Sequence, residues 1–497
     1  MNAAGWCACI VKTTKMRRNF ILFLLVGAVS ALAARSHATG RGVSKLRSPS
    51  GHQREGSSLL HMTAASSTAS PNKTRGEATV SSSTFNLAKS IIGAGVLSLP
   101  SGISFFADVP SAILPASIMC AVMGLVSAYT FSLIGRVCEK TGATSFQDAW
   151  GKTIDPKSAW TISAGITAMC FLASLAYSII IGDSFTSLAT SFNLPRLLAE
   201  RSNVILLITT FVLFPLCSLK SLNSLSPFSL LGLGGTLYTA LFMVIRYLDG
   251  SYAAKGKFFA ALAPALKPSF HQRGGYSVNH LTFVLISMLS TSYIAHYNAP
   301  KFYVELKDAS MPRFNKVVTY AFGASIATFI LMMNIGFLTF GGATSGFVLN
   351  NYAGSDSLAS FARLAIGLAL LTGYPFTFSA LRDGILDLAK LKGDDRTSKM
   401  RPLTIGLITV ITSLALALKD VGYVVSLSGA LFGSVLMFVV PAIMNISSLK
   451  ASTKTSGKEL SRGSKMEIVV NYLMISTGIV MGGLGVAIST LRQMKKL

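Results

Sequence analysis

Two polar interruptions within apolar stretches carry the groups in this sequence that could bind a charged ligand. The first is the step Gly93-Ala94-Gly95, which lies between Lys89 and Pro100 in the apolar stretch 83–102. A helix in lipid must satisfy its own backbone hydrogen bonds, and glycine and proline both weaken that ladder. The step therefore indicates either close helix packing or a break at which backbone N–H and C=O groups are open to a ligand.

A second interruption lies in the stretch 285–308, where the polar step Ser290-Thr291-Ser292 precedes His296, Asn298 and Pro300. Paired interruptions in corresponding spans are typical of an inverted repeat with its binding site at mid-membrane. Broken helix ends offer N–H groups and a positive dipole end to a carboxylate, and carbonyl groups to an ammonium or a cation. We therefore expect the two breaks to meet around a zwitterion such as an amino acid.

The elements that must position these breaks are membrane-spanning helices. Of the 497 residues, 51% are hydrophobic and only 13% are charged, whereas about a quarter of residues are charged in soluble proteins. The interruptions fall in the first and sixth apolar segments, which predicts an all-α polytopic membrane protein with a five-plus-five inverted repeat and one trailing helix. About eleven segments reach the length of about 20 residues that crosses a bilayer, with centres at Gly95, Met123, Cys170, Val212, Tyr238, Ser290, Thr328, Leu370, Thr412, Gly433 and Gly478.

The net charge of +25 is spread over the gaps between apolar segments, so it indicates membrane topology and not a nucleic-acid-binding domain. Lysine and arginine concentrate in the gaps that follow even-numbered segments. By the positive-inside rule, this places the N-terminus inside and the C-terminus outside. The richest such gap, after the eighth segment, contains Arg382, Lys390, Lys392, Arg396, Lys399 and Arg401.

The first 82 residues have the composition of a leader and a linker. Arg17 and Arg18 precede an apolar run that ends in small residues at 34, which predicts a signal peptide or targeting leader over 1–34, with Met16 as an alternative start. Residues 35–82 are basic, rich in serine and expected to be disordered. The pattern resembles the two-part plastid leaders of algae with secondary plastids, and a secretory signal or anchor with a disordered tail is the alternative. The membrane domain is expected over 83–492.

The sequence contains no enzyme motif with the residue spacing that its chemistry requires. Gly151-Lys152-Thr153 resembles the end of a phosphate-binding loop, but the earlier glycine that such a loop requires is replaced by Phe146. The six cysteines form no CxxC pair and there is no HExxH motif, so no catalytic residue, metal or cofactor is expected.

Over roughly Ser82 to Leu491 the sequence resembles the amino acid/auxin permease family, which includes the sodium-coupled neutral amino acid transporters. The eighth segment contributes Arg363 and the motif TGYPFTFSALRD at 372–383. The family's sixth-span histidine, tyrosine and Glu-Leu pair also recur, although its proline lies one place early, at Pro300. The matching residues are Phe85, Asn86, Leu87, Ile91, Gly93, Gly95, Val96, Leu97 and Leu99 in the first segment and His296, Tyr303, Glu305 and Leu306 in the sixth.

The resemblance implies a leucine-transporter-type fold, a substrate site between spans one, three, six and eight, and secondary active transport of amino acids by alternating access. A transporter-like amino acid sensor that signals through a partner is the alternative. The residues expected at the substrate are Ile92, Gly93, Ala94, Gly95, Val96, Tyr177, Thr291, Ser292 and Tyr293. Those expected to couple transport to H⁺ or Na⁺ are Asn86, Lys89, His296 and Thr372.

One departure from the family bears on the driving ion. Lys89 stands where the sodium-coupled relatives have an asparagine that helps to bind sodium, and an ammonium group has no acceptor for a cation. We therefore expect proton-coupled or uncoupled transport, unless Lys89 extends to the interface.

Four other polar side chains have two interpretations each. Asp183 is expected to cap the third span, with an ion pair as the alternative, and Arg363 to extend to the interface or pair at the outer end of the eighth span. His296 either braces the sixth-span break or relays a proton, and Tyr177 either covers the substrate or packs.

Overall fold

The computed structural model describes residues 76–219, 229–270, 279–456 and 460–494. This part of the chain is almost entirely helical, and its two isolated β-bridges join Ala78 to Leu306 and Ser269 to Gly341. Seven continuous helical spans within it are long and apolar enough to cross a membrane. They are Pro110–Thr141 (containing α4, Ile113–Thr141), Pro156–Ser191 (α6, Trp160–Ser191), α13 (Met311–Phe340), α14 (Ser357–Leu388), α15 (Gly393–Ala417), Val421–Thr453 (α16, Val421–Ser428, to α17, Val440–Ser456) and α18 (Arg462–Met494).

A bent pair of helices forms an eighth candidate span, with a bend of 41° between Val80–Ile91 (α2) and Ala94–Ser104. Shorter apolar helices occupy Arg201–Cys217 (α8, Arg201–Ile208, to α9, Phe214–Cys217) and Gly232–Leu248 within α10 (Ser229–Leu248). The predicted sixth span consists of α11 (Thr282–Tyr293) and α12 (Ala299–Glu305). All eleven predicted centres thus fall in helical segments, while length and hydropathy alone qualify seven spans, or eight with the bent pair.

The break in the first span lies at Ile92 and Gly93. Helix α2 ends at Ile91, and Ile92 (φ −79°, ψ 83°) and Gly93 (φ −114°, ψ −175°) leave the helical region. The chain then winds again as η1 (Ala94–Ser98) and α3 (Leu99–Ser104). Pro100 lies in the first turn of α3, where the missing N–H would have no helical partner. The proline therefore starts the second half-helix and does not kink a continuous one.

The sixth span is broken in the same way. Helix α11 ends at Tyr293, and Ile294 (ψ 111°) and Ala295 (φ −135°) are not helical. A short turn, η8 (His296–Asn298), leads into α12, where Pro300 again occupies the first turn. The polar step Ser290-Thr291-Ser292 lies inside α11, so the break follows it by two residues.

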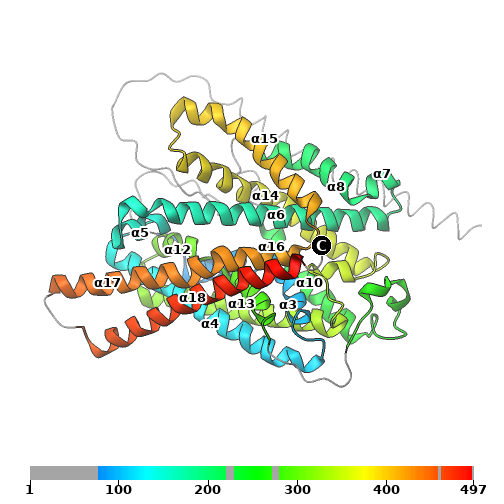
Figure 1. Cartoon of the computed structure of the whole chain (residues 1–497), viewed down its shortest axis with the longest axis horizontal. Helices are drawn as coiled ribbons and strands as arrows, with labels where there is room; N and C mark the ends of the chain where they lie inside the picture. Colours follow the sequence, from blue (N-terminus) through cyan, green and yellow to red (C-terminus); the bar gives the residue numbers. More distant parts are fainter. Residues whose placement is uncertain (1–75, 220–228, 271–278, 457–459, 495–497) are drawn as a thin grey trace, which may run out of the picture.

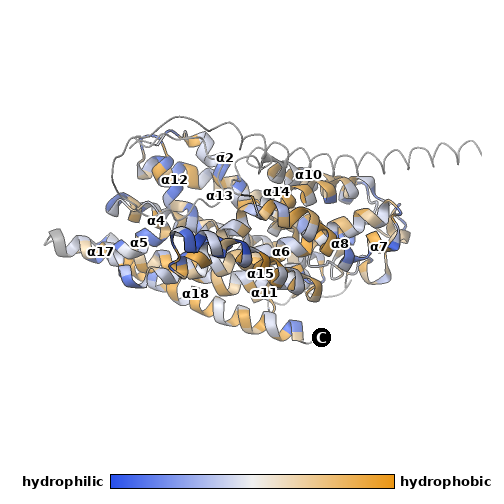
Figure 2. Cartoon of the chain, turned by 90° about the horizontal axis from the view of Figure 1, so that it is seen from above, coloured by the Kyte–Doolittle hydropathy of each residue, from blue (hydrophilic) through white to orange (hydrophobic). Residues whose placement is uncertain are grey.

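The helices form two groups around the broken spans. In Figure 1, α6, α8, α14 and α15 lie in the upper half and α3, α4, α10 and α13 in the lower half. Helix α14 packs along α6, α13 packs along α4 and α2, and α11 packs against α16, α18 and α3. Figure 2 shows the apolar colouring that runs along these helices. On α4 the exposed residues Leu114, Ile118, Val122 and Leu125 follow one helical face, as expected for contact with lipid.

A tight glycine contact holds the first half of the broken sixth span. A methyl group built on Gly429 would overlap the carbonyl oxygen of Ser287 in α11 and approach the Thr291 hydroxyl oxygen to 2.7 Å. Gly429 begins the π-helical turn Gly429–Gly433 that follows α16. The close approach of these two backbones therefore requires glycine.

We predict that Gly429→Ala lowers the stability of the purified protein by about 1–3 kcal/mol, because the added carbon forces α11 and the α16 region apart. The melting temperature in detergent measures this effect. Gly483→Ala is the matched control, since a carbon added at Gly483 meets no heavy atom within 4 Å among the described residues. Equal melting temperatures for the two variants would contradict the prediction.

Candidate functional site

The two breaks meet. A carbon added to Gly95 would lie 3.7 Å from the Oγ of Ser292, and α11 packs against both η1 and α3. The first residues of a helix have no intrahelical acceptor for their N–H groups, which applies to Ala94 and Gly95 at the start of η1. The place where the two spans are interrupted therefore presents backbone groups and a helix N-terminus together, as the sequence predicts.

Gly93 makes this place accessible. It is exposed, and a carbon added to it meets no heavy atom within 4 Å in the described part of the chain. Ile92 and Val96, by contrast, are buried at 5% and 1% exposure, so their side chains belong to the core. Of the five predicted residues of this segment, Gly93, Ala94 and Gly95 are exposed or partly exposed at the break, and Ile92 and Val96 are buried in the core.

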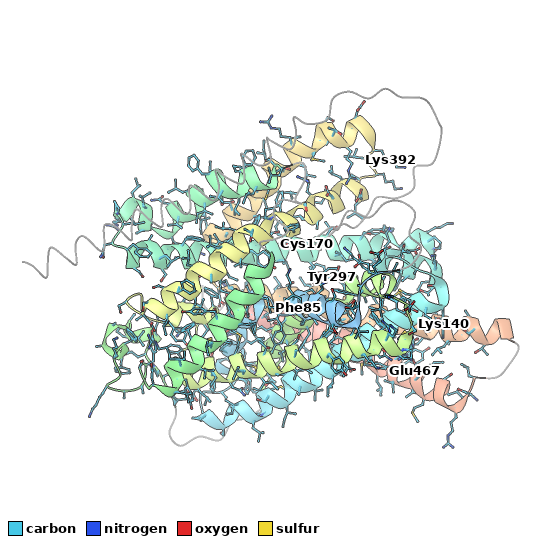
Figure 3. All side chains as sticks on the ribbon, turned by 180° about the vertical axis from the view of Figure 1, so that it is seen from behind. Phe85, Lys140, Cys170, Tyr297, Lys392 and Glu467 are labelled. Carbon is cyan, nitrogen blue, oxygen red and sulfur yellow. The ribbon has the colours of Figure 1, made fainter. Side chains whose placement is uncertain are left out.

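Helices α6 and α14 bring aromatic and hydroxyl groups to the same region. The Tyr177 hydroxyl of α6 interacts with Thr377 of α14, and Tyr297 of η8 lies within electrostatic reach of Tyr177 and Cys170. Figure 3 shows Tyr297 and Cys170 near the middle of the molecule. Tyr297 and Thr377 were missed from the sequence. The available signal was their position, within the sixth-span interruption and within the motif 372–383.

The other predicted hydroxyl groups already donate hydrogen bonds. Thr291 donates to the Val425 carbonyl (2.6 Å), and Ser292 donates to the Met288 carbonyl (2.9 Å). Tyr293 is fully buried and donates to the Cys120 carbonyl of α4 (3.1 Å). Thr291 and Tyr293 thus fix the end of α11 to neighbouring helices.

Thr372 has a similar local bond, because its hydroxyl donates to the Leu368 carbonyl of its own helix at 3.0 Å. Its oxygen, like that of Ser292, retains lone pairs that can accept a hydrogen bond or contact a cation.

His296 joins the sixth-span break to α4. Its Nε2 lies 2.9 Å from the Thr130 Oγ1 and 3.1 Å from the Ser127 carbonyl oxygen, and the ring is fully buried with an edge contact to Phe131. The Thr130 hydroxyl donates to the carbonyl of Val126, so Nε2 carries the proton and donates to Ser127. The Nδ1 atom has no hydrogen-bond partner among the described residues. This geometry matches the bracing role.

One face of α2 is polar and exposed. Ser82, Asn86, Ser90 and Gly93 follow that face at helical spacing, and all four are exposed. Phe85, at 46% exposure, lies beside them (Figure 3). Polar groups are costly against lipid, so the face fits a water-filled path from the start of α2 to the break. Lys89 is half-buried in the last turn of α2, next to this path.

A polar cluster joins the helices at the opposite end. Asp183 forms an ion pair with the Nε of Arg201 (2.7 Å) and accepts a hydrogen bond from Asn350 (2.9 Å) in η9 (Val348–Asn351). Arg201 also donates to the Ala415 carbonyl of α15. The expectation that Asp183 caps a helix is wrong, because it lies within α6 and bonds to two other elements, α8 and η9; the alternative, an ion pair, is confirmed.

Arg363 was expected to extend to the interface or to pair at the outer end of the eighth span. The outward extension is wrong, and among the described residues its hydrogen-bond partners are backbone carbonyls. Its side chain is 1% exposed, and its Nη2 donates to the carbonyls of Leu349 and Tyr352 at 2.7 and 2.5 Å. The arginine therefore fixes the loop between α13 and α14 through two hydrogen bonds to its backbone.

Comparisons with known proteins bear on this arrangement. Residues 76–489 match the model of the transmembrane amino acid transporter protein family. A Danio rerio protein named "Putative sodium-coupled neutral amino acid transporter 11" is 25% identical over 82% of this chain and 86% of its own length. Vacuolar amino acid transporter 2 of Saccharomyces cerevisiae is 26% identical over 75% of this chain and 77% of its own.

A solved structure has the same fold. The crystal structure of MhsT in complex with L-phenylalanine superposes with a TM-score of 0.51 and 13% sequence identity, covering 84% of this chain and all of that one. The leucine-transporter-type fold implied by the sequence resemblance is thereby confirmed. The chain therefore belongs to the family of transmembrane amino acid transporters, and it is an integral multi-pass membrane protein and not an enzyme.

Proposed function

We propose that this protein is a secondary active transporter that carries amino acids across a membrane by alternating access, with the substrate bound where the two breaks meet. The observation that carries the proposal is the contact of Gly95 with Ser292 beside the accessible backbone of Gly93. The N–H groups that begin η1 suit a carboxylate, and the carbonyl ends of α2 and α11 suit an ammonium group. Tyr177 and Tyr297 would cover the side of the substrate that faces α6.

Alternating access is supported by the difference between the two ends. The polar face of α2 gives access to the break from the end where α2 begins, and the cluster of Asp183, Arg201 and Asn350 closes the other end. Opening the end at which this cluster lies requires the hydrogen bond between Asn350 and Asp183 to break. If the N-terminus lies inside, the end at which α2 begins is also inside, so the present conformation faces inward.

We predict that Gly93→Val lowers amino acid uptake into proteoliposomes by about tenfold or more, equivalent to about 1.4 kcal/mol, while the melting temperature stays unchanged. The extended backbone at Gly93 accepts any residue, and the added side chain enters open space at the break. Gly323→Val on α13 is the control, because Gly323 is exposed and the added carbon also enters open space, but not at a break.

If Gly93→Val takes up amino acids at the normal rate, the break in the first span is not part of the substrate path. If the unmodified protein binds amino acids but moves none, the sensor alternative replaces transport.

We further propose that transport is proton-coupled or uncoupled, and that Lys89 takes the place of a bound cation. Its position in the last turn of α2 puts an ammonium group near the negative end of that half-helix, where carbonyl groups would otherwise hold a cation. The relatives include one named as putatively sodium-coupled and one named as vacuolar, and neither name decides the ion for this chain.

Replacement of sodium by choline should therefore leave uptake at its original rate, measured in proteoliposomes at constant ionic strength. Loss of uptake in choline would overturn the proposed role of Lys89 without affecting the proposed substrate site.

The proposed leader (1–34) and nearly all of the proposed linker (35–82) lie outside the described residues. We propose that they direct the protein into the secretory pathway and, through a plastid-type leader, to the plastid envelope. A fluorescently tagged chain lacking 1–75 should then lose its organelle while remaining in membranes, whereas an unchanged location would refute a targeting role.

A further inference from the structure

A cavity of about 650 Å³ lies where α6 ends and α14 begins, away from the breaks of the first and sixth spans. Its walls come from the end of α6, the start of α8, the loop segment 261–266 and the segment 350–355. Three charged residues line it, namely Asp183, Arg201 and Arg363. The proposed transport cycle breaks the Asp183–Asn350 contact in the wall of this cavity, but it assigns no occupant to the cavity itself.

The guanidinium group of Arg363 is only partly satisfied. Its Nη2 makes both of the hydrogen bonds to backbone carbonyls, while Nε and Nη1 have no hydrogen-bond partner among the described residues. The group carries five N–H donors, so three of them are unpaired although the side chain is almost completely buried. A buried cation in this condition is costly unless a counter-charge or strong acceptors accompany it.

The neighbouring carboxylates are already committed to other cations. The two carboxylate oxygens of Asp356 accept hydrogen bonds from the Nη2 and Nε of Arg246, at 2.7 and 2.8 Å. Asp183 is paired with Arg201. Asp249 also pairs with Arg246, so three carboxylates balance three arginines in this region. Among the described residues none of these carboxylates accepts a hydrogen bond from Arg363, so its unpaired N–H groups still lack an acceptor.

A second unsatisfied donor lines the same cavity. The Thr186 hydroxyl is buried and has no hydrogen-bond partner in the described part of the chain. Thr186 comes from α6 and Arg363 from α14, so two packed helices place residues with unpaired donors in the wall of one open cavity.

We propose that this cavity binds a small monovalent anion beside Arg363, with Thr186 as an additional donor. The shared chemistry is a compact negative charge that accepts several hydrogen bonds, supplied either by a carboxylate or by a halide. Such charge-assisted bonds to a guanidinium fork are among the strongest that side chains form. The anion would accept hydrogen bonds from the unpaired N–H groups of Arg363 and thereby stabilise the loop between α13 and α14.

The test uses the purified full-length chain in detergent, with its melting temperature followed as sodium chloride or sodium acetate is added to a low-salt buffer. A ligand that binds the folded state raises the melting temperature in a saturable way. We expect this rise in the unmodified protein, an apparent affinity weaker by about tenfold or more in Arg363→Lys, and no saturable rise in Arg363→Gln. A saturable rise in melting temperature with chloride but not with acetate indicates a halide site. A saturable rise with acetate indicates a carboxylate site.

Arg382→Gln is the matched control. Arg382 is also a buried arginine of α14, and it donates to the Cys217 carbonyl at the opposite end of the helix, so its loss lowers stability but should leave the anion effect intact. Thr186→Val retains Arg363 and should weaken the effect, which keeps the test decisive if Arg363→Gln does not fold. Equal responses in the unmodified protein and Thr186→Val or Arg363→Gln, or no saturable response to either anion, would overturn the proposal.

Discussion

The structure depends on one constraint, which is that backbone hydrogen-bonding groups inside a membrane need partners. A helix satisfies this need along its whole length, so an interruption is tolerated only where protein or water replaces the lost bonds. Both interruptions in this chain obey the rule. Ile92 and Gly93 border the polar face of α2, and Ile294 and Ala295 are followed at once by His296, which is bonded to α4.

The same constraint explains the surroundings of the breaks. The hydroxyl groups near the end of α11 donate to carbonyls of α11 itself, α16 and α4, so that the end of the helix is fixed while its last carbonyl groups remain at the break. Each proline begins a half-helix, where its missing N–H costs nothing. Rigid supports on both sides of a short irregular segment are what a binding site made of backbone requires.

The sequence predicted the breaks well because their signals are local. Glycine, proline and polar steps weaken a helix wherever it is placed, so their positions survive folding. Side-chain direction was harder, because each residue turns the helix by about 100°. Tyr293, for example, was expected at the substrate and donates to the Cys120 carbonyl of α4. Long-range pairs such as Asp183 with Arg201 could not be predicted, since they depend on how α6 and α8 pack.

The bridge between Ala78 and Leu306 links the two broken spans at a point far from their breaks. Ala78 donates to the Glu305 carbonyl (3.0 Å) and accepts from the Lys307 N–H (2.9 Å), so the start of α2 is strapped to the end of α12. A pull on one half-helix is transmitted to the other through this strap. We therefore expect α2 and α12 to move together during transport, and the N-terminal chain joins this pair next to the bridge.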